Sequence, residues 1–180
     1  MAENKSTQII DSEGLNKAIT RLAHEIVEGN RGVENVVIVG IRTRGVPLAE
    51  RIIAKIEQFE KQRLPLGILD ITMYRDDVFK KIKQPKVRTT EIDFEIDGKI
   101  VVLVDDVLFT GRTVRAALDA TIDFGRPTKI QLAVLVDRGH RELPICANYV
   151  GEMITTSVED EVKVYMKELD HTEGVFLVKP

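Results

Sequence analysis

The chain has 180 residues, of which 43% are hydrophobic and 31% charged, as expected of one ordinary globular domain with a full core. Its 26 basic and 29 acidic residues give a formal net charge of −3, so binding to nucleic acid would need a local basic face. The short apolar runs exclude a membrane-spanning helix, and the N-terminus lacks the pattern of a signal peptide. The single cysteine, Cys146, excludes an intrachain disulfide and suits the reducing cytosol, so we expect a cytoplasmic protein.

Helix and strand patterns alternate along most of the chain. Apolar residues from Leu15 to Val27 recur at helical spacing behind a capping Asp11 or Ser12, and residues 35–40 have the β-branched run of a buried strand. Further helices are predicted at 47–62 and 113–124, and further strands at 66–74, 99–105, 129–137, 163–166 and 174–178. The alternation predicts one α/β domain over residues 1–180, with an open, mainly parallel twisted sheet flanked by helices.

The stretch 75–97 departs from this alternation. It is charged and contains "KKIKQPK", with Pro85 in the middle. We predict a mobile hood, irregular or folded as a β-hairpin, that carries little of the core and closes over a site as a lid.

The stretch "LVDDVLFTGRTVRAA", 103–117, combines an apolar strand, two adjacent carboxylates and a small hydroxyl-rich loop before a helix. Ligands of parallel sheets bind at the carboxyl ends of the strands, where Asp105 and Asp106 are expected. The loop from Thr110 to Thr113 can hold a phosphate with backbone N–H groups and hydroxyls at the helix N-terminus. The carboxylates would repel that phosphate and suit sugar hydroxyls or a hydrated Mg²⁺ instead. A ribose 5-phosphate fits both halves of the stretch.

Other interpretations of this stretch remain. An apolar strand that ends in acids also describes the Mg²⁺-binding strand of P-loop ATPases, but the G-x-x-x-x-G-K-[ST] motif of that class is absent. A phospho-acceptor aspartate would leave "TGRT" unexplained. A capped helix without any ligand is the third alternative.

The same residues resemble a known family. "VVLVDDVLFTGRT", 101–113, resembles the phosphoribosyl-diphosphate (PRPP) signature of type I phosphoribosyltransferases, and "ITMYRDD", 71–77, resembles the start of their hood. The resemblance implies that Asp105 and Asp106 bind the ribose and act in catalysis. It implies that the substrate is also bound by the residues that follow: Val107, Leu108, Phe109, Thr110, Gly111, Arg112 and Thr113. Mg²⁺ would arrive with PRPP, bridged to the two aspartates by water and without a direct protein ligand.

The loop "GIRTRG", 40–45, resembles the family's pyrophosphate loop, which implies that Thr43 and a catalytic Arg44 contact the leaving group. For backbone N–H groups to reach a diphosphate there, the chain must turn sharply between Arg42 and Gly45. Type I relatives often do so with a non-proline cis peptide, so we predict an unusual backbone conformation in this loop.

Two further stretches narrow the resemblance. "AITRLAHE", 18–25, and "QLAVLVDRGHRELPI", 131–145, are similar to bacterial pyrimidine-operon attenuation regulators that are also uracil phosphoribosyltransferases, and the similarity covers roughly residues 8–180. It implies conversion of uracil and PRPP to UMP and diphosphate, UMP-dependent binding to leader mRNA, and a homo-oligomer, dimeric or higher. Phe109 stands where purine-using relatives commonly carry an aspartate. The resemblance places Arg138 near bound nucleotide. The alternative interpretation of Arg138 is an arginine in a surface turn.

Polar residues on the first helix suggest a second binding site. Lys17, Thr20, Arg21 and His24 fall on one face, opposite the apolar stripe. Taken alone, this is a solvated helix face, which we expect to lie away from the strand ends because the helix precedes the first strand. The resemblance assigns Thr20, Arg21, His24 and Arg141 to an RNA hairpin, although Cys146 replaces an arginine of the regulators. The alternatives are an RNA-binding UMP sensor with negligible catalysis, or a type I enzyme for another base.

Overall fold

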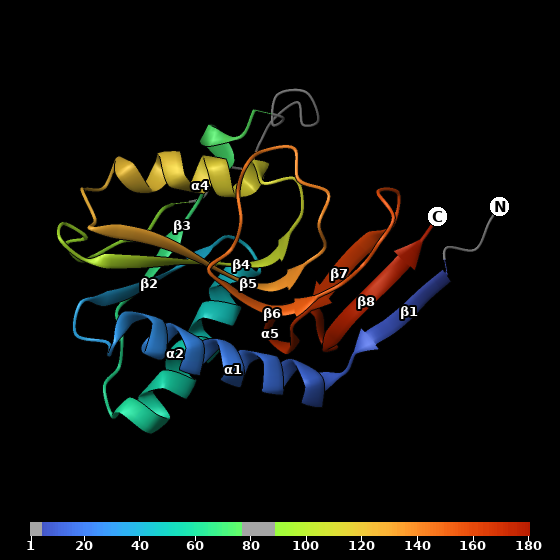
Figure 1. Cartoon of the computed structure of the whole chain (residues 1–180), viewed down its shortest axis with the longest axis horizontal. Coiled ribbons are helices and arrows are strands. Elements are labelled where there is room, and N and C mark those ends of the chain that lie inside the picture. Colours follow the sequence, from blue (N-terminus) through green and yellow to red (C-terminus); the bar gives the residue numbers. More distant parts are fainter. Residues whose placement is uncertain (1–4, 77–88) are drawn as a thin grey trace.

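The computed structural model describes residues 5–76 and 89–180, which form two sheets and their flanking helices (Figure 1). The larger sheet has the strand order β3-β2-β4-β5-β6, and its four strand pairs are all parallel. Its strands are β2 (Val36–Ile41), β3 (Leu66–Leu69), β4 (Ile100–Leu108), β5 (Lys129–Asp137) and β6 (Tyr149–Met153). The smaller, antiparallel sheet has the order β1-β8-β7 and consists of β1 (Lys5–Ile10), β7 (Glu161–Tyr165) and β8 (Gly174–Lys179).

Helices cover both faces of the larger sheet, as a parallel sheet requires. The helices are α1 (Ser12–Asn30), α2 (Gly45–Glu60) and α4 (Arg112–Ile122), with a short 3₁₀ turn η1 (Thr72–Tyr74) and the four-residue α5 (Lys167–Asp170). In Figure 1, α1 and α2 lie below the sheet and α4 lies above it. The central strand β4 serves both layers, because Val102 and Val104 pack with α1 and α2 while Val101 and Leu103 pack on the side of α4. The predicted class, a parallel sheet flanked by helices, is confirmed.

The strand order fixes where a ligand can bind. After β2 the chain crosses to β3 on one side, and after β4 it crosses to β5 on the other, so the connections diverge between β2 and β4. At such a point the loops that follow the two strands separate and leave a crevice at their carboxyl ends. The loops 42–44 and 109–111 are therefore the expected walls of a site.

Several element predictions are confirmed and others are wrong. Helix α1 begins after Asp11, whose Oδ1 accepts the Gly14 N–H at 2.8 Å, and β5 has the predicted bounds. The strand predicted at 66–74 ends at Leu69, because Oδ1 of Asp70 accepts both the N–H and the hydroxyl of Thr72 and turns the chain. Strand β4 extends to Leu108, three residues beyond its predicted end at Asp105.

The hood prediction is partly wrong. Residues 77–88, which include Pro85, lie outside the described residues. Of the remainder, Glu91 forms an antiparallel bridge with Ile68 at the edge of the sheet. Ile96 is fully buried, and Ile92 and Phe94 pack against the same apolar cluster, so this segment belongs to the core.

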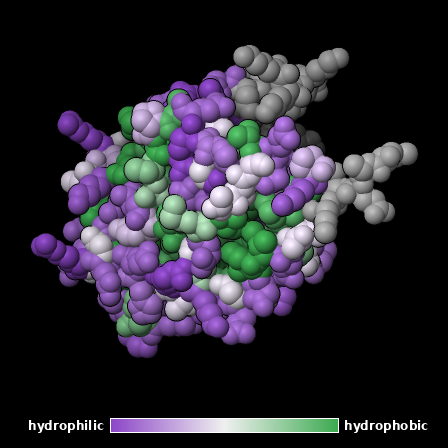
Figure 2. Space-filling model, turned by 45° about the vertical axis from the view of Figure 1, so that its right-hand side comes forward, coloured by the Kyte–Doolittle hydropathy of each residue, from purple (hydrophilic) through white to green (hydrophobic). Residues whose placement is uncertain are grey.

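The outer surface agrees with the charged composition. The face shown in Figure 2 is largely hydrophilic, with a compact hydrophobic area right of centre. Within residues 5–76 and 89–180, we find no helix with the length and apolarity needed to cross a membrane.

The burial of Ile96 gives a stability prediction. Ile96→Ala should lower the free energy of unfolding by about 2–5 kcal/mol, since it removes a buried side chain and leaves a cavity. Urea denaturation would measure the loss. Ile122→Ala is the control, because Ile122 is 62% exposed and its truncation should cost little. A change at Ile96 no larger than that at Ile122 would contradict the core assignment.

Candidate functional site

Two glycines bring the strand ends together. A Cβ at Gly40 would lie 2.7 Å from Cα of Val46, and a Cβ at Gly45 would overlap the carbonyl oxygen of Val104. Backbone therefore packs on backbone where β2 ends, α2 begins and β4 passes. Only glycine fits such contacts, so the start of α2 and the loop that leads into it from β2 lie directly against β4.

The 42–44 loop has the predicted unusual backbone, since the peptide bond between Arg42 and Thr43 is cis. Thr43 is exposed in this turn. Arg44 is the N-cap of α2 and donates from Nε to the Val164 carbonyl at 2.7 Å and from Nη2 to Oδ1 of Asp170 at 2.8 Å. In this structure the Arg44 guanidinium is thus held by the segment that leads from β7 into α5.

The two aspartates lie within β4, near its carboxyl end, and their carboxyl groups interact with each other. Oδ1 of Asp105 accepts the Asp106 N–H at 3.0 Å, and Oδ1 of Asp106 accepts the Val107 N–H at 2.9 Å. A single ligand at this end of β4 can therefore reach both carboxylates.

Both aspartates resist ionisation. Burial raises the pKa of Asp105 well above its ordinary range, and the neighbouring Asp106 carboxylate raises it further, while Arg75 acts in the opposite direction. Burial also raises the pKa of Asp106, and Arg44 counteracts this. A ligand that donates hydrogen bonds or brings positive charge would relieve both groups.

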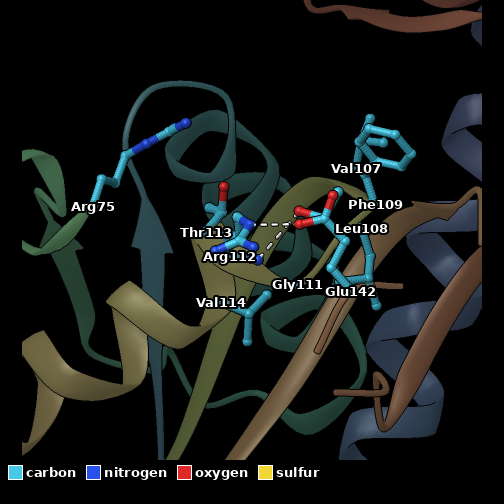
Figure 3. Close-up of a pocket in the computed structure, with 10 residues that line it drawn as sticks. Arg75, Val107, Leu108, Phe109, Gly111, Arg112, Thr113, Val114 and Glu142 are labelled. Carbon is cyan, nitrogen blue, oxygen red and sulfur yellow. Dashed lines mark hydrogen bonds and ion pairs between the residues drawn. The ribbon is translucent and has the colours of Figure 1, made fainter. Parts of the chain in front are cut away.

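A pocket of about 410 Å³ opens at the predicted phosphate loop (Figure 3). It is lined by Arg75, the continuous run 107–114 and Glu142, so the substrate-binding residues predicted from Val107 to Thr113 come together. Gly111 has φ +93 and is the N-cap of α4, which gives the helix N-terminus its sharp entry. The N–H groups of the first turn of α4 are available to an anion at this point.

Charged side chains surround this pocket. Arg112 donates to Oδ2 of Asp76 and to Oε2 of Glu142, each at 2.6 Å, and Figure 3 shows Arg112 and Glu142 turned toward each other. These ion pairs are exposed and contribute little to stability. An incoming phosphate can therefore compete for Arg112.

Arg138 is a buried residue, so its alternative as a surface-turn arginine is wrong. Its Cζ lies 4.1 Å from the centroid of the Phe109 ring, and its Nη2 donates to the Ser157 carbonyl at 2.8 Å. Burial lowers its pKa. Arg138 thereby stacks on the residue that directly precedes Thr110.

Arg141 points inward. Its guanidinium donates to the Phe109 and Ile145 carbonyls at 2.9 Å, and it also pairs with the Asp137 carboxylate. It joins the loop after β5 to the loop after β4. The predicted contact of Arg141 with RNA stays a prediction, and this arrangement gives it no support.

A second pocket was missed by sequence reasoning. It is lined by Arg44, Asp106 and the strand 161–165, so β7 of the small sheet stands over the carboxyl end of β4. The sequence of the C-terminal strands shows only a loose alternation, and this pattern does not indicate that they approach the aspartates. Their position depends on long-range contacts that a local pattern cannot predict. Among the described residues, the small sheet covers the second pocket.

The helix face proposed for RNA lies on the opposite layer from the phosphate pocket. His24 is exposed and stacks on Phe59 with ring centroids 4.2 Å apart, and Thr20 is partly exposed. Arg21 donates to the Gly151 carbonyl and, at 2.9 Å, to Oε1 of Glu152. Arg21 thus reaches the last residues of β6, so the expectation that this face lies away from all strand ends is wrong for Arg21.

The residues at the site can be compared with what the expected magnesium ion would need. Among the residues that the structure describes, no group of three or more His, Cys, Asp or Glu side chains could hold a metal by itself. Asp105 and Asp106, when ionised, can accept hydrogen bonds from metal-bound water. The site therefore fits an ion that arrives with its own ligands.

Comparisons with known proteins agree with this geometry. A family model described as the phosphoribosyl transferase domain matches residues 5–168. The chain is 58% identical over 179 residues to a protein named bifunctional protein PyrR from Pelotomaculum thermopropionicum, with 99% of this chain and 98% of that protein covered. A protein of the same name from Deinococcus radiodurans is 54% identical over 180 residues, covering 100% and 98%.

Solved structures share the fold at low identity. A hypoxanthine-guanine phosphoribosyltransferase from Bacillus anthracis superposes with a TM-score of 0.72 at 20% identity, covering 99% of this chain and 100% of that one. The hypoxanthine phosphoribosyltransferase of Trypanosoma cruzi gives a TM-score of 0.76 at 17% identity, covering 98% and 96%. These likenesses concern the architecture of the sheet and its helices.

The raised pKa of Asp105 predicts how stability depends on pH. In the unfolded chain the Asp105 carboxyl has a pKa of about 4. Because the pKa is raised in the folded protein, ionisation of Asp105 opposes folding. The free energy of unfolding therefore falls as the pH rises from about 4 through the folded-state pKa. Asp105→Asn should therefore unfold at a higher temperature than the wild type at pH 8, and the difference should narrow as the pH falls toward 5.

Thermal denaturation at several pH values would measure this difference. Asn keeps the acceptor for the Asp106 N–H, so the local backbone should survive the change. Asp93→Asn at an exposed position is the control and should leave the midpoint unchanged. A less stable Asp105→Asn protein at pH 8 would refute the assignment of a costly buried charge.

Proposed function

The chain belongs to the phosphoribosyltransferase family, and from this premise we propose that it transfers the phosphoribosyl group of PRPP to uracil, giving UMP and diphosphate, and that it also regulates pyrimidine genes by binding leader RNA. The observation that carries the enzymatic part is the aspartate pair of β4, with Asp105 buried and Asp106 partly buried, beside the phosphate pocket at the start of α4. The relatives that share more than half of their sequence with this chain are named bifunctional, which supports two roles.

The reaction breaks the bond between ribose C1 and the diphosphate oxygen and forms a bond from C1 to N1 of uracil, and the N1 proton is released to solvent. Asp105 and Asp106 would accept hydrogen bonds from the ribose hydroxyls, and their negative charge would favour the cationic C1 that develops. The loop 110–113 would hold the 5-phosphate, and this fixes the sugar in line for attack. We assign no general base.

The leaving diphosphate would meet the loop 42–44. Thr43 is exposed there, and Arg44, the last residue of the loop, lines the second pocket. Asp105 and Asp106 would hold, through water molecules, a Mg²⁺ ion that arrives with PRPP, and the ion would supply positive charge for the diphosphate. The small sheet stands beside this position and would help to exclude water.

Phe109 weakens the case for a purine substrate. The ring of Phe109 lies under Arg138 and cannot exchange a proton, whereas purine-using relatives commonly carry an aspartate there. A type I enzyme for another base remains the alternative, and so does an RNA-binding UMP sensor with negligible catalysis. Assembly as a homo-oligomer also stays a prediction.

Turnover assays test the enzymatic proposal. The wild type should form nucleotide from uracil in preference to orotate, hypoxanthine or guanine. Changing Asp105 and Asp106 together to Asn should lower turnover by about 100-fold or more, since the amides lose the negative charge at C1 and weaken the hold on the hydroxyls. Circular dichroism would verify the fold. Activity of the double variant within a few-fold of the wild type would defeat the ribose assignment.

The RNA proposal rests on the exposed face of α1. Arg21 carries a half-exposed side chain, and the ring edge of His24 is available beside Phe59. Cations of this kind bind phosphates, and rings stack on unpaired bases of RNA loops. Glu152 now holds Arg21, so RNA would have to displace that carboxylate.

Changing Arg21 and His24 together to Ala should weaken binding of a leader-RNA hairpin by about 1–3 kcal/mol, because a phosphate contact and a stacked ring are lost. Filter binding at several salt concentrations would measure this, and the salt dependence should become shallower. Uracil phosphoribosyltransferase activity should stay near normal.

Arg115→Ala is the matched control, because Arg115 is likewise a half-exposed cation in an ion pair, and it lies on α4 at the other face of the sheet. It should leave hairpin affinity unchanged. A wild type that does not prefer the hairpin over scrambled RNA would remove the regulatory role, whereas a double variant that binds RNA normally but loses turnover would show that the RNA face was misplaced.

A further inference from the structure

Asp170 holds the guanidinium of Arg44. Its Oδ1 accepts from Nη2 of Arg44 at 2.8 Å, while the Val164 carbonyl accepts from Nε at 2.7 Å. The side chain of Asp170 is only 15% exposed and that of Arg44 is 35% exposed. Two acceptors from the β7–α5 segment therefore fix the plane of the guanidinium.

The second oxygen of Asp170 is also occupied. Oδ2 accepts the Met166 N–H at 2.9 Å, so both oxygens of one carboxylate receive donors. An amide in its place offers one acceptor and one donor, and it would turn its NH₂ group toward one of the two existing donors. The arrangement requires a carboxylate.

Arg44 faces the reaction site from this fixed position. Its side chain lines the second pocket together with Asp106 and the strand 161–165. Asp106, Arg44 and Asp170 thus form an alternating row of charges from the central strand to α5. The role of Arg44 toward the leaving diphosphate is part of the proposed function.

On that function we propose that Asp170 is a positioning residue, which orients Arg44 toward the diphosphate as the C1–oxygen bond breaks. A mobile cation still attracts a bound diphosphate, whereas the transition state needs the cation in one orientation. Loss of Asp170 should therefore lower kcat while diphosphate affinity stays equal or rises, since a negative charge has been removed beside Arg44.

The chain offers a matched control in the neighbouring ion pair of α2 and α5. Arg51 donates from Nε and Nη2 to the two oxygens of Glu168, each at 2.8 Å. Glu168→Gln makes the same carboxylate-to-amide change and weakens the same attachment of α5 to α2. Because Glu168 does not contact Arg44, the Glu168→Gln variant measures how much a weaker attachment of α5 alone lowers kcat.

The experiment compares Asp170→Asn with Glu168→Gln and the wild type. Steady-state kinetics gives kcat and the KM for PRPP, and calorimetry gives the affinity and stoichiometry of Mg²⁺-diphosphate. Asp170→Asn should lower kcat about 10–100-fold with full diphosphate stoichiometry and no loss of affinity, and Glu168→Gln should keep kcat within about twofold. Equal kcat losses in both variants, or an unchanged kcat in Asp170→Asn, would overturn the proposal.

A double-mutant cycle adds an independent measurement. In an Arg44→Lys background, Asp170→Asn should lower kcat much less than it does in the wild type, because its partner is already changed. Additive losses would overturn the proposal.

Asp170→Ser takes the place of Asp170→Asn, with the same expectation, if the Asp170→Asn protein does not fold. A wild type without turnover on any base refutes the proposed function, whereas an active wild type with an equally active Asp170→Asn variant refutes the role of Asp170 alone.

Discussion

The site depends on a backbone contact that leaves no room for side chains. Gly45 at the start of α2 lies against the Val104 carbonyl of β4, and Gly40 lies against the first turn of the same helix. This contact sets the loop after β2 directly beside the aspartates of β4. A methyl group at either position would push the loop away from β4 and separate the groups assigned to the leaving diphosphate from those assigned to the ribose.

The charges around that contact oppose one another and have to be balanced by the fold. Burial raises the pKa of both Asp105 and Asp106, and the charge of Asp106 raises that of Asp105 further, so ionised carboxylates in β4 cost stability. Arg44 offsets part of that cost at Asp106, and it is balanced in turn by Asp170. The protein therefore keeps ionisable side chains at a poorly solvated position where apolar residues would be more stabilising. Such an arrangement is common where binding or catalysis needs an electrostatic field.

The sequence was most informative where chemistry and local pattern coincide. The apolar run before Asp105 and the loop 110–113 predicted both the central strand and the pocket. Long-range contacts were out of reach: Arg44 meets Asp170 across 126 positions, and nothing near either residue marks the pairing. The inward turn of Arg141 could not be foreseen for the same reason, because its acceptors are backbone carbonyls that only the folded loops supply. Strand β1 has a polar composition, and it becomes a strand by pairing with β8.

The strand order of the small sheet has a consequence for how the protein is made. Because β8 is the middle strand, it alone joins β1, near the beginning of the chain, to β7. On the ribosome the five parallel strands can assemble while β1 and β7 still lack their shared neighbour, and the small sheet forms only once residues 174–179 have emerged. A nascent chain would thus hold the phosphate pocket before it holds the wall beside Arg44.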